Sequence, residues 1–312
     1  LLRRIFARHL TALKKRPMTE AHAPDSSQYY IPHNSPWPIR ASLALFALML
    51  AAITFLNDWA GGWVFIPGAL LLAYMFFGWF STVIGENQHG TYNLQVDRSF
   101  RMGMMWFIFS EVMFFGAFFG ALFYARVLSV PWLGGQGVKV FTNFILWPDY
   151  EAVWPTNGPA HVGGLANGAF SPMAPTPIPA LNTAILLTSG LTVTIAHHAL
   201  RAGKRAPLAV FLALTFLLGF TFVSLQAHEY SEAYRDMGLR LSTGIYGSTF
   251  FMLTGFHGLH VTIGAIMLTV IWLRVLRGHF TPNRHFAFEA VAWYWHFVDV
   301  VWLGLFIFVY WL

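Results

Sequence analysis

Glu111 is a carboxylate in the middle of the apolar run at residues 107–115. If residues 99–128 form one helix, Glu111 lies about 18 Å from the Ser99 end, inside a hydrocarbon layer about 30 Å thick. The helix positions around it are all apolar: Met104, Phe107, Ile108, Phe114, Phe115 and Phe118. A carboxyl at this depth is neutral, paired with another helix or in contact with water. Glu111 is therefore either a functional carboxyl or one half of a structural hydrogen bond between helices.

Two later apolar runs carry candidate partners for this acid. His257 and His260 are three residues apart, so they lie on adjoining parts of one helix face, where they could bind a metal or a haem iron or form hydrogen bonds in the core. His296 and Asp299 have the same spacing, which permits an imidazole–carboxylate pair that lowers the cost of burying either group. Measured from the inner ends of their spans, Glu111, His260 and His296 lie about 18, 24 and 20 Å deep. His260 and His296 are thus the candidate partners with matching depth.

Other ionisable residues fall near the ends of apolar runs. These are His197-His198, His228-Glu229, and His285 with Glu289. We predict that they lie at the membrane interface, the first two groups as caps of their helices. The sequence contains no Gly-rich phosphate loop, zincin motif or nucleophile elbow, so it shows no machinery for catalysis by this chain alone.

The composition determines which elements must position these residues. Of the 312 residues, 56% are hydrophobic and only 10% are charged, against about 25% charged in soluble domains. The absence of cysteine excludes disulfides and thiolate metal sites but leaves histidine sites open. We predict an all-α membrane protein with seven transmembrane helices, at residues 37–56, 63–84, 99–128, 180–200, 207–228, 243–276 and 283–311.

The segments between these helices define the organisation of the chain. Residues 1–36 form a cytoplasmic N-terminal tail, residues 37–84 a helical hairpin, and residues 85–312 the other five helices with the long outer loop. A Gly- and Pro-rich stretch at residues 129–178 predicts a long extramembrane loop without a core of its own.

The distribution of basic residues predicts the orientation. Of the 19 Lys and Arg residues, 15 fall on the N-terminal side of the membrane and four on the other: Arg126, Lys139, Arg235 and Arg240. The positive-inside rule therefore places the N-terminus in the cytoplasm, and seven spans place the C-terminus outside. Residues 1–17 are strongly basic and precede Met18. We interpret them as lying upstream of the usual start, with a surface amphipathic helix or a targeting segment as alternatives.

Several strings in this sequence resemble cytochrome c oxidase subunit III. They are Ser35-Pro36-Trp37-Pro38, Phe109-Ser110-Glu111-Val112-Met113-Phe114-Phe115, Ala196-His197-His198, Tyr246-Gly247-Ser248-Thr249-Phe250-Phe251, Gly255-Phe256-His257-Gly258-Leu259-His260-Val261 and Trp293-Tyr294-Trp295-His296-Phe297-Val298-Asp299-Val300-Val301-Trp302. They follow the family's order and span the chain from about residue 29. The loop at residues 129–178 is longer than in short members of the family.

The resemblance implies a core subunit of a bacterial proton-pumping oxidase that transfers electrons from cytochrome c to O2. Such a subunit has no haem or copper of its own, because these lie in partner subunits. It docks on subunit I, with subunit II in the same complex. Its first two helices are separated from the other five by a V-shaped cleft that holds phospholipids and guides O2. The expected location is the bacterial cytoplasmic membrane, and no nucleic-acid partner is expected.

The resemblance also implies residue roles. Glu111 matches the family's buried carboxyl, His260 is its partner, and together they would support proton uptake by the catalytic subunit. His89, Arg274 and His279 match positions that bind lipid headgroups, which suits an anionic phosphate at the inner face. Two alternatives are a proton-coupled transporter that uses Glu111 and a haem-binding electron carrier. The transporter is disfavoured because the sequence shows no inverted repeat or broken midplane helix.

Overall fold

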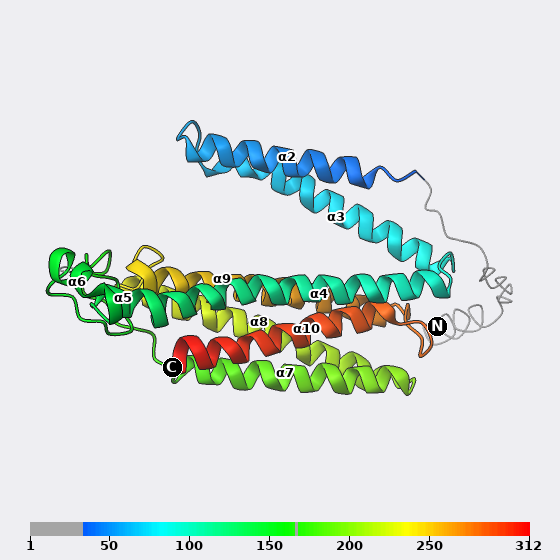
Figure 1. The fold of residues 1–312 in the computed structure, drawn as a ribbon. Coiled ribbons are helices and arrows are strands. Elements are labelled where there is room, and N and C mark those ends of the chain that lie inside the picture. Colours follow the sequence, from blue (N-terminus) through cyan, green and yellow to red (C-terminus); the bar gives the residue numbers. More distant parts are fainter. Residues whose placement is uncertain (1–33, 166–167) are drawn as a thin grey trace, which may run out of the picture. The chain divides into compact units, whose positions relative to one another are not determined.

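The structure is a computed structural model that describes residues 34–165 and 168–312. The predictions for residues 1–33, including the interpretations of residues 1–17, lie outside the described residues. Within the described part, seven helices are long and apolar enough to cross a membrane, which confirms the predicted all-α fold class (Figure 1).

The helices follow one another without strands in the described ranges. Their bounds are α2 (Trp37–Leu56), η1 (Gly62–Val64), α3 (Phe65–Gln88), α4 (Leu94–Phe123), η2 (Tyr124–Ser129), α5 (Val130–Leu133), η3 (Gly137–Lys139), α6 (Val140–Leu146), α7 (Ile178–Arg201), α8 (Arg205–Arg235), α9 (Gly244–Leu276), α10 (Phe286–Leu305) and η5 (Phe306–Trp311). Both η2 and η5 are π-helical turns that continue α4 and α10.

Two helix ends differ from the sequence prediction by five residues or more, and each has a local cause. Helix α4 begins at Leu94 rather than at 99, because the Asn93 side chain accepts a hydrogen bond from the Val96 N–H at 3.0 Å, as an N-cap residue does. Helix α8 ends at Arg235 rather than at 228. Residues 229–235 are polar but contain no Gly or Pro, so nothing in the backbone stops the helix where the apolar run ends.

The first compact unit extends to Phe100 and contains the α2–α3 hairpin. Glycines allow the two helices to approach closely. A Cβ atom at Gly68 would lie 2.9 Å from the Leu48 side chain, and one at Gly78 would overlap the ring of Trp37. The Trp37 indole also donates a hydrogen bond to Thr82 Oγ1 at 3.1 Å.

The second compact unit comprises residues 101–312 and contains α7, α8, α9 and α10, which pack on one another, with the main part of α4. Trp295 of α10 lies at its centre with no exposed surface. Its ring sits between Gly219 of α8 and Gly264 of α9, where added Cβ atoms would lie 2.6 and 2.8 Å away. Its indole N–H donates to Ser189 Oγ of α7 at 2.9 Å. One tryptophan therefore sets the spacing of four helices.

The stretch at residues 129–178 is more ordered than the predicted loop, since it includes α5, η3 and α6. Polar contacts organise it. The side-chain amide of Asn143 donates to the carbonyls of Leu133, Trp147 and Tyr150 at 3.2, 2.7 and 3.3 Å. No residue of α6 is buried, in keeping with a segment that has little apolar core.

Candidate functional site

Glu111 of α4 meets His260 of α9. Glu111 Oε2 lies 2.9 Å from His260 Nε2, and the two side chains are 22% and 11% exposed. The other ring nitrogen, His260 Nδ1, lies 2.6 Å from the carbonyl oxygen of Phe256. A carbonyl only accepts, so Nδ1 carries a hydrogen and Nε2 faces the acid. The pair therefore shares one proton, held either as a carboxylic acid against a neutral imidazole or as a carboxylate against an imidazolium.

Aromatic rings surround the imidazole of this pair. Phe114 and Phe115, three and four residues after Glu111 on α4, place their ring centroids 6.0 and 5.1 Å from that of His260. Tyr294 and Phe297 of α10 lie 6.3 Å away on another side. The helical spacing that puts phenylalanines beside Glu111 thus also supplies the apolar walls that fix its partner.

His257 does not join the Glu111 pair. It has no exposed surface, and its Nε2 donates to the Val298 carbonyl of α10 at 3.2 Å. Its ring lies 5.6 Å from Phe222 and 5.0 Å from Trp302. His257 therefore links α9 to α10, while His260, three residues later, faces the acid of α4.

His296 and Asp299 lie together on α10 and face α7. His296 Nδ1 is 3.5 Å from Asp299 Oδ2, and His296 Nε2 is 3.3 Å from Thr194 Oγ1. A Cβ atom at Gly190 of α7 would lie within 2.3 Å of the same Asp299 oxygen. The structure brings these two residues together as the spacing predicts. Of the two depth-matched histidines, His260 meets Glu111 and His296 does not.

Glu229 of α8 is another buried acid, and it was missed as a candidate from the sequence. It has no exposed surface and accepts a hydrogen bond of 2.7 Å from the Tyr310 hydroxyl of η5. Its other oxygen, Oε2, has no hydrogen-bond partner among the described residues. The prediction that His228-Glu229 caps a helix at the interface is wrong for Glu229, because α8 continues to Arg235 and carries this side chain into the bundle.

Glu289 of α10 contacts basic side chains from three segments. Its Oε2 accepts from Arg101 Nη1 of α4 at 2.5 Å. Its Oε1 lies 3.2 Å from His285 Nε2 and 3.6 Å from His197 Nε2 of α7. The spacing of His285 and Glu289 is visible in the sequence. His197 was predicted only to cap a helix. The four residues form one cluster where α7 ends and α10 begins.

The three residues matched to lipid binding fall in both compact units. His89 caps the end of α3 in the first unit, where its Nδ1 lies 2.6 Å from the Gly85 carbonyl. Arg274 of α9, in the second unit, is buried, and its guanidinium lies 4.6 Å above the Phe280 ring. His279 follows in the same turn. Its pKa is lowered by burial and, to a lesser extent, by the nearby charges of Arg274 and Arg277.

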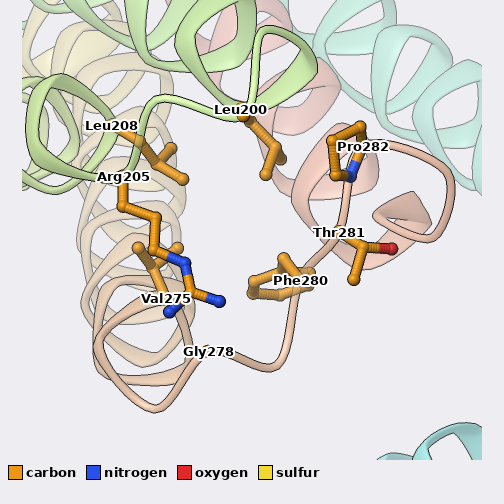
Figure 2. A pocket seen from close by; sticks show the side chains of 9 residues that line it. Leu200, Arg205, Leu208, Val275, Gly278, Phe280, Thr281 and Pro282 are labelled. Atoms are coloured by element: carbon orange, nitrogen blue, oxygen red, sulfur yellow. The ribbon is translucent and has the colours of Figure 1, made fainter.

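A pocket of about 210 Å³ opens beside this turn (Figure 2). It is lined by Leu200, Gly203, Arg205, Leu208, Val275, Gly278, Phe280, Thr281 and Pro282. Its wall is apolar apart from Thr281 and Arg205. The Arg205 side chain runs past Val275 toward Gly278. Phe280 therefore both lines the pocket and contacts the Arg274 guanidinium.

Seven apolar helices with acid–base pairs buried between them define a multi-pass membrane protein. Residues 27–146 and 151–312 match the sequence pattern of the family described as cytochrome c oxidase subunit III. The chain therefore belongs to the cytochrome c oxidase subunit III family, as its motifs suggest.

Relatives of known identity agree with this assignment. The chain is 40% identical to "Cytochrome c oxidase subunit 3" of Carassius auratus over 94% of this chain and 98% of the relative. It is 40% identical to the protein of the same name from Pongo abelii, over 93% and 98% of the two chains. The corresponding protein of Latimeria chalumnae is 41% identical over 94% and 98%. The similarity covers the whole set of spans and both members of the Glu111–His260 pair.

Proposed function

We propose that this chain is the non-redox third subunit of a proton-pumping cytochrome c oxidase. In this role it binds and stabilises the catalytic subunit I, with subunit II in the same complex, and leaves haem and copper to those partners. Family membership supports the complex, which is an oxidoreductase. The observation that carries the specific role is the hydrogen bond between Glu111 and His260.

This pair is suited to holding and releasing one proton within the membrane. Moving the proton along the 2.9 Å line between Glu111 Oε2 and His260 Nε2 converts a neutral pair into an ion pair without leaving a lone charge in the apolar bundle. The Glu111 side chain is 22% exposed, and the proposal is that its proton exchanges through this surface. The proposed role is to support proton uptake by the catalytic subunit.

Replacement of Glu111 by glutamine tests this role. In Glu111→Gln the amide donates to His260 Nε2 and preserves the contact, but it cannot release a proton. We expect an assembled oxidase whose proton uptake per electron falls or whose activity decays faster during turnover, measured by proton release from oxidase vesicles and by oxygen consumption. Ser110→Ala is the matched control, since Ser110 is exposed and its hydroxyl bonds only to its own helix at Phe107.

Two outcomes would contradict the proposal. Complete failure of Glu111→Gln to assemble would assign Glu111 a structural hydrogen bond. Unchanged proton coupling and unchanged decay in an assembled Glu111→Gln oxidase would remove the proton role.

Phospholipid binding forms a second part of the proposal. The basic groups His89, Arg274 and His279 would hold headgroup phosphates, and the acyl chains would guide O2. Arg274 supports this because its Nε is buried without a hydrogen-bond partner among the described residues. The pocket beside it presents Arg205 over an apolar wall (Figure 2). The V-shaped lipid cleft stays a prediction, because the two compact units are each described on their own.

The orientation proposed from the basic residues places the N-terminus in the cytoplasm and the C-terminus outside. It is supported by the concentration of Lys and Arg on one side of the spans. The bacterial cytoplasmic membrane stays a prediction, since the relatives named above come from vertebrates. The transporter alternative gains no support from these relatives.

A further inference from the structure

Three potential metal ligands converge where α7 ends and α10 begins. They are His197, one turn before the end of α7, His285, at the N-cap of α10, and Glu289, in the first turn of α10. One ligand atom from each lies within 4.8 Å of the other two. The side chains are 28%, 11% and 15% exposed, so they are largely shielded and still reachable from water.

Some hydrogen-bonding atoms of this cluster have no partner among the described residues. Both imidazoles direct Nε2 toward the same carboxylate oxygen, Glu289 Oε1, yet both Nε2 atoms are buried and have no hydrogen-bond partner among the described residues. His285 Nδ1 lies 3.2 Å from the Thr281 carbonyl, which can only accept. In neutral His285, Nδ1 therefore holds the hydrogen and Nε2 presents a lone pair to a negatively charged oxygen. A cation between them would remove this repulsion.

The spacing of the ligand atoms suits a small cation. Atoms bound tetrahedrally to one Zn²⁺ at about 2.0–2.1 Å are about 3.3 Å apart. Glu289 Oε1 lies 3.2 Å from His285 Nε2 and 3.6 Å from His197 Nε2. The two histidine nitrogens lie within 4.8 Å of each other, so His197 and His285 would have to move closer where that distance exceeds 3.3 Å.

The surroundings hold two of the ligands in place. The hydrogen bond from His285 Nδ1–H to a backbone carbonyl is the kind that orients a metal-binding imidazole. Arg101 holds Glu289 Oε2 at 2.5 Å, which leaves Oε1 directed at the two histidines. Arg101 also adds a positive charge near the ion, so binding should be weaker than at a site without it.

We propose that His197, His285 and Glu289 bind a divalent transition-metal ion of the Zn²⁺ type, with water as the fourth ligand. Two imidazoles and one carboxylate favour such an ion over Mg²⁺ or Ca²⁺, which prefer oxygen ligands. The ion links the last turns of α7 to the first turn of α10. The site is separate from the Glu111–His260 pair and uses residues of this chain alone.

Zinc binding to the full chain, purified in detergent with its accompanying subunits, tests the site. Samples are stripped with EDTA, dialysed against Zn²⁺ and analysed for zinc per chain. We expect His197→Ala and His285→Ala to hold one zinc fewer per chain than the wild type, or to bind that zinc at least ten-fold more weakly. His198→Ala is the matched control, because His198 is the adjacent, exposed histidine outside the cluster, and it should bind as the wild type does.

Equal zinc content in all four proteins would overturn the proposal and favour a protonated His285 that donates from both nitrogens. Loss of zinc in His198→Ala to the same extent would place the ion elsewhere. If a variant fails to assemble, anomalous scattering at the zinc edge from crystals of the wild-type complex decides. Density among the three ligand atoms supports the site, and zinc density only at other positions contradicts it. Neither measurement depends on oxidase activity. A negative result for the zinc site is therefore distinct from a failure of the proposed function.

Discussion

Glu111 and Glu229 are both acids that lie between helices of the same five-helix unit, and each bonds to one ring of another helix. The partner of Glu111 is an imidazole, and the partner of Glu229 is the phenol of Tyr310. An imidazole gains and loses a proton near neutral pH, whereas a phenol does so only near pH 10. Glu111 also keeps some exposed surface, while Glu229 has none.

The difference shows that burial alone does not assign a role to a membrane carboxyl. In the Glu111–His260 pair the imidazole can take the proton, and Glu111 keeps some exposed surface. The Glu229–Tyr310 pair has neither feature, so we interpret it as a fixed link between α8 and η5. Substitutions at Glu229 should therefore affect stability, and substitutions at Glu111 should affect proton transfer.

The largest effect on stability is expected for Glu229→Ala. This change leaves a cavity and strands the Tyr310 hydroxyl, which together should cost about 2–4 kcal/mol of unfolding free energy. Thermal unfolding of the purified protein, followed by circular dichroism, measures the loss. Glu111→Gln, which retains its hydrogen bond, should change the unfolding free energy by less than about 1 kcal/mol. Equal losses of unfolding free energy in Glu229→Ala and Glu111→Gln would contradict the interpretation that Glu229 has the structural role.

A smaller effect is expected for Tyr310→Phe. It keeps the packing of the ring but removes the donor to Glu229, whose second oxygen already lacks a partner. The buried carboxyl should then cost about 1–3 kcal/mol of stability. Tyr124→Phe, at an exposed tyrosine in η2, serves as the control. An unfolding temperature for Tyr310→Phe that matches the control would show that the phenol does not hold the acid.

The smallest effect concerns His279, an imidazole outside the spans. Because its folded-state pKa is lowered from 6.5, the unfolded chain binds its proton at a higher pH than the folded chain does. Stability from this group is therefore full above pH 6.5, decreases as pH falls through the interval below 6.5, and levels off beneath the folded-state pKa. His279→Asn should flatten that part of the curve of unfolding temperature against pH. If His279→Asn leaves the pH dependence of the unfolding temperature unchanged, that dependence comes from other groups.

The sequence predicts the spans well because apolar length alone determines them, and α2 begins and ends at the predicted residues. It predicts helix ends less well, since these depend on local bonds such as the Asn93 cap of α4. Glu229 was placed at an interface because hydropathy ends there, although the helix does not. The positions of Glu229 and Tyr310 in the sequence do not show that the Tyr310 hydroxyl lies within hydrogen-bond distance of Glu229.

For the sites as well, the sequence predicts contacts within one helix better than contacts between helices. Depth along the helices narrowed the partner of Glu111 to His260 or His296, but the choice depends on which face of each helix turns inward. Only the family resemblance selected His260 from the sequence. The cluster at Glu289 was half visible, as an acid four residues after His285, while its other members come from α4 and α7.

The π-helical turn η5 restricts how the C-terminal part of the chain can vary. Its wider winding brings Tyr310 to the side of the helix that faces α8. If the wide turn is kept, deleting one residue between 306 and 309 would rotate Tyr310 around the axis by one residue position, which would carry its hydroxyl out of reach of Glu229. An inserted residue in this segment would rotate Tyr310 in the opposite direction and would also move its hydroxyl away from Glu229. Evolution can therefore exchange residue types in this segment more freely than it can change their number.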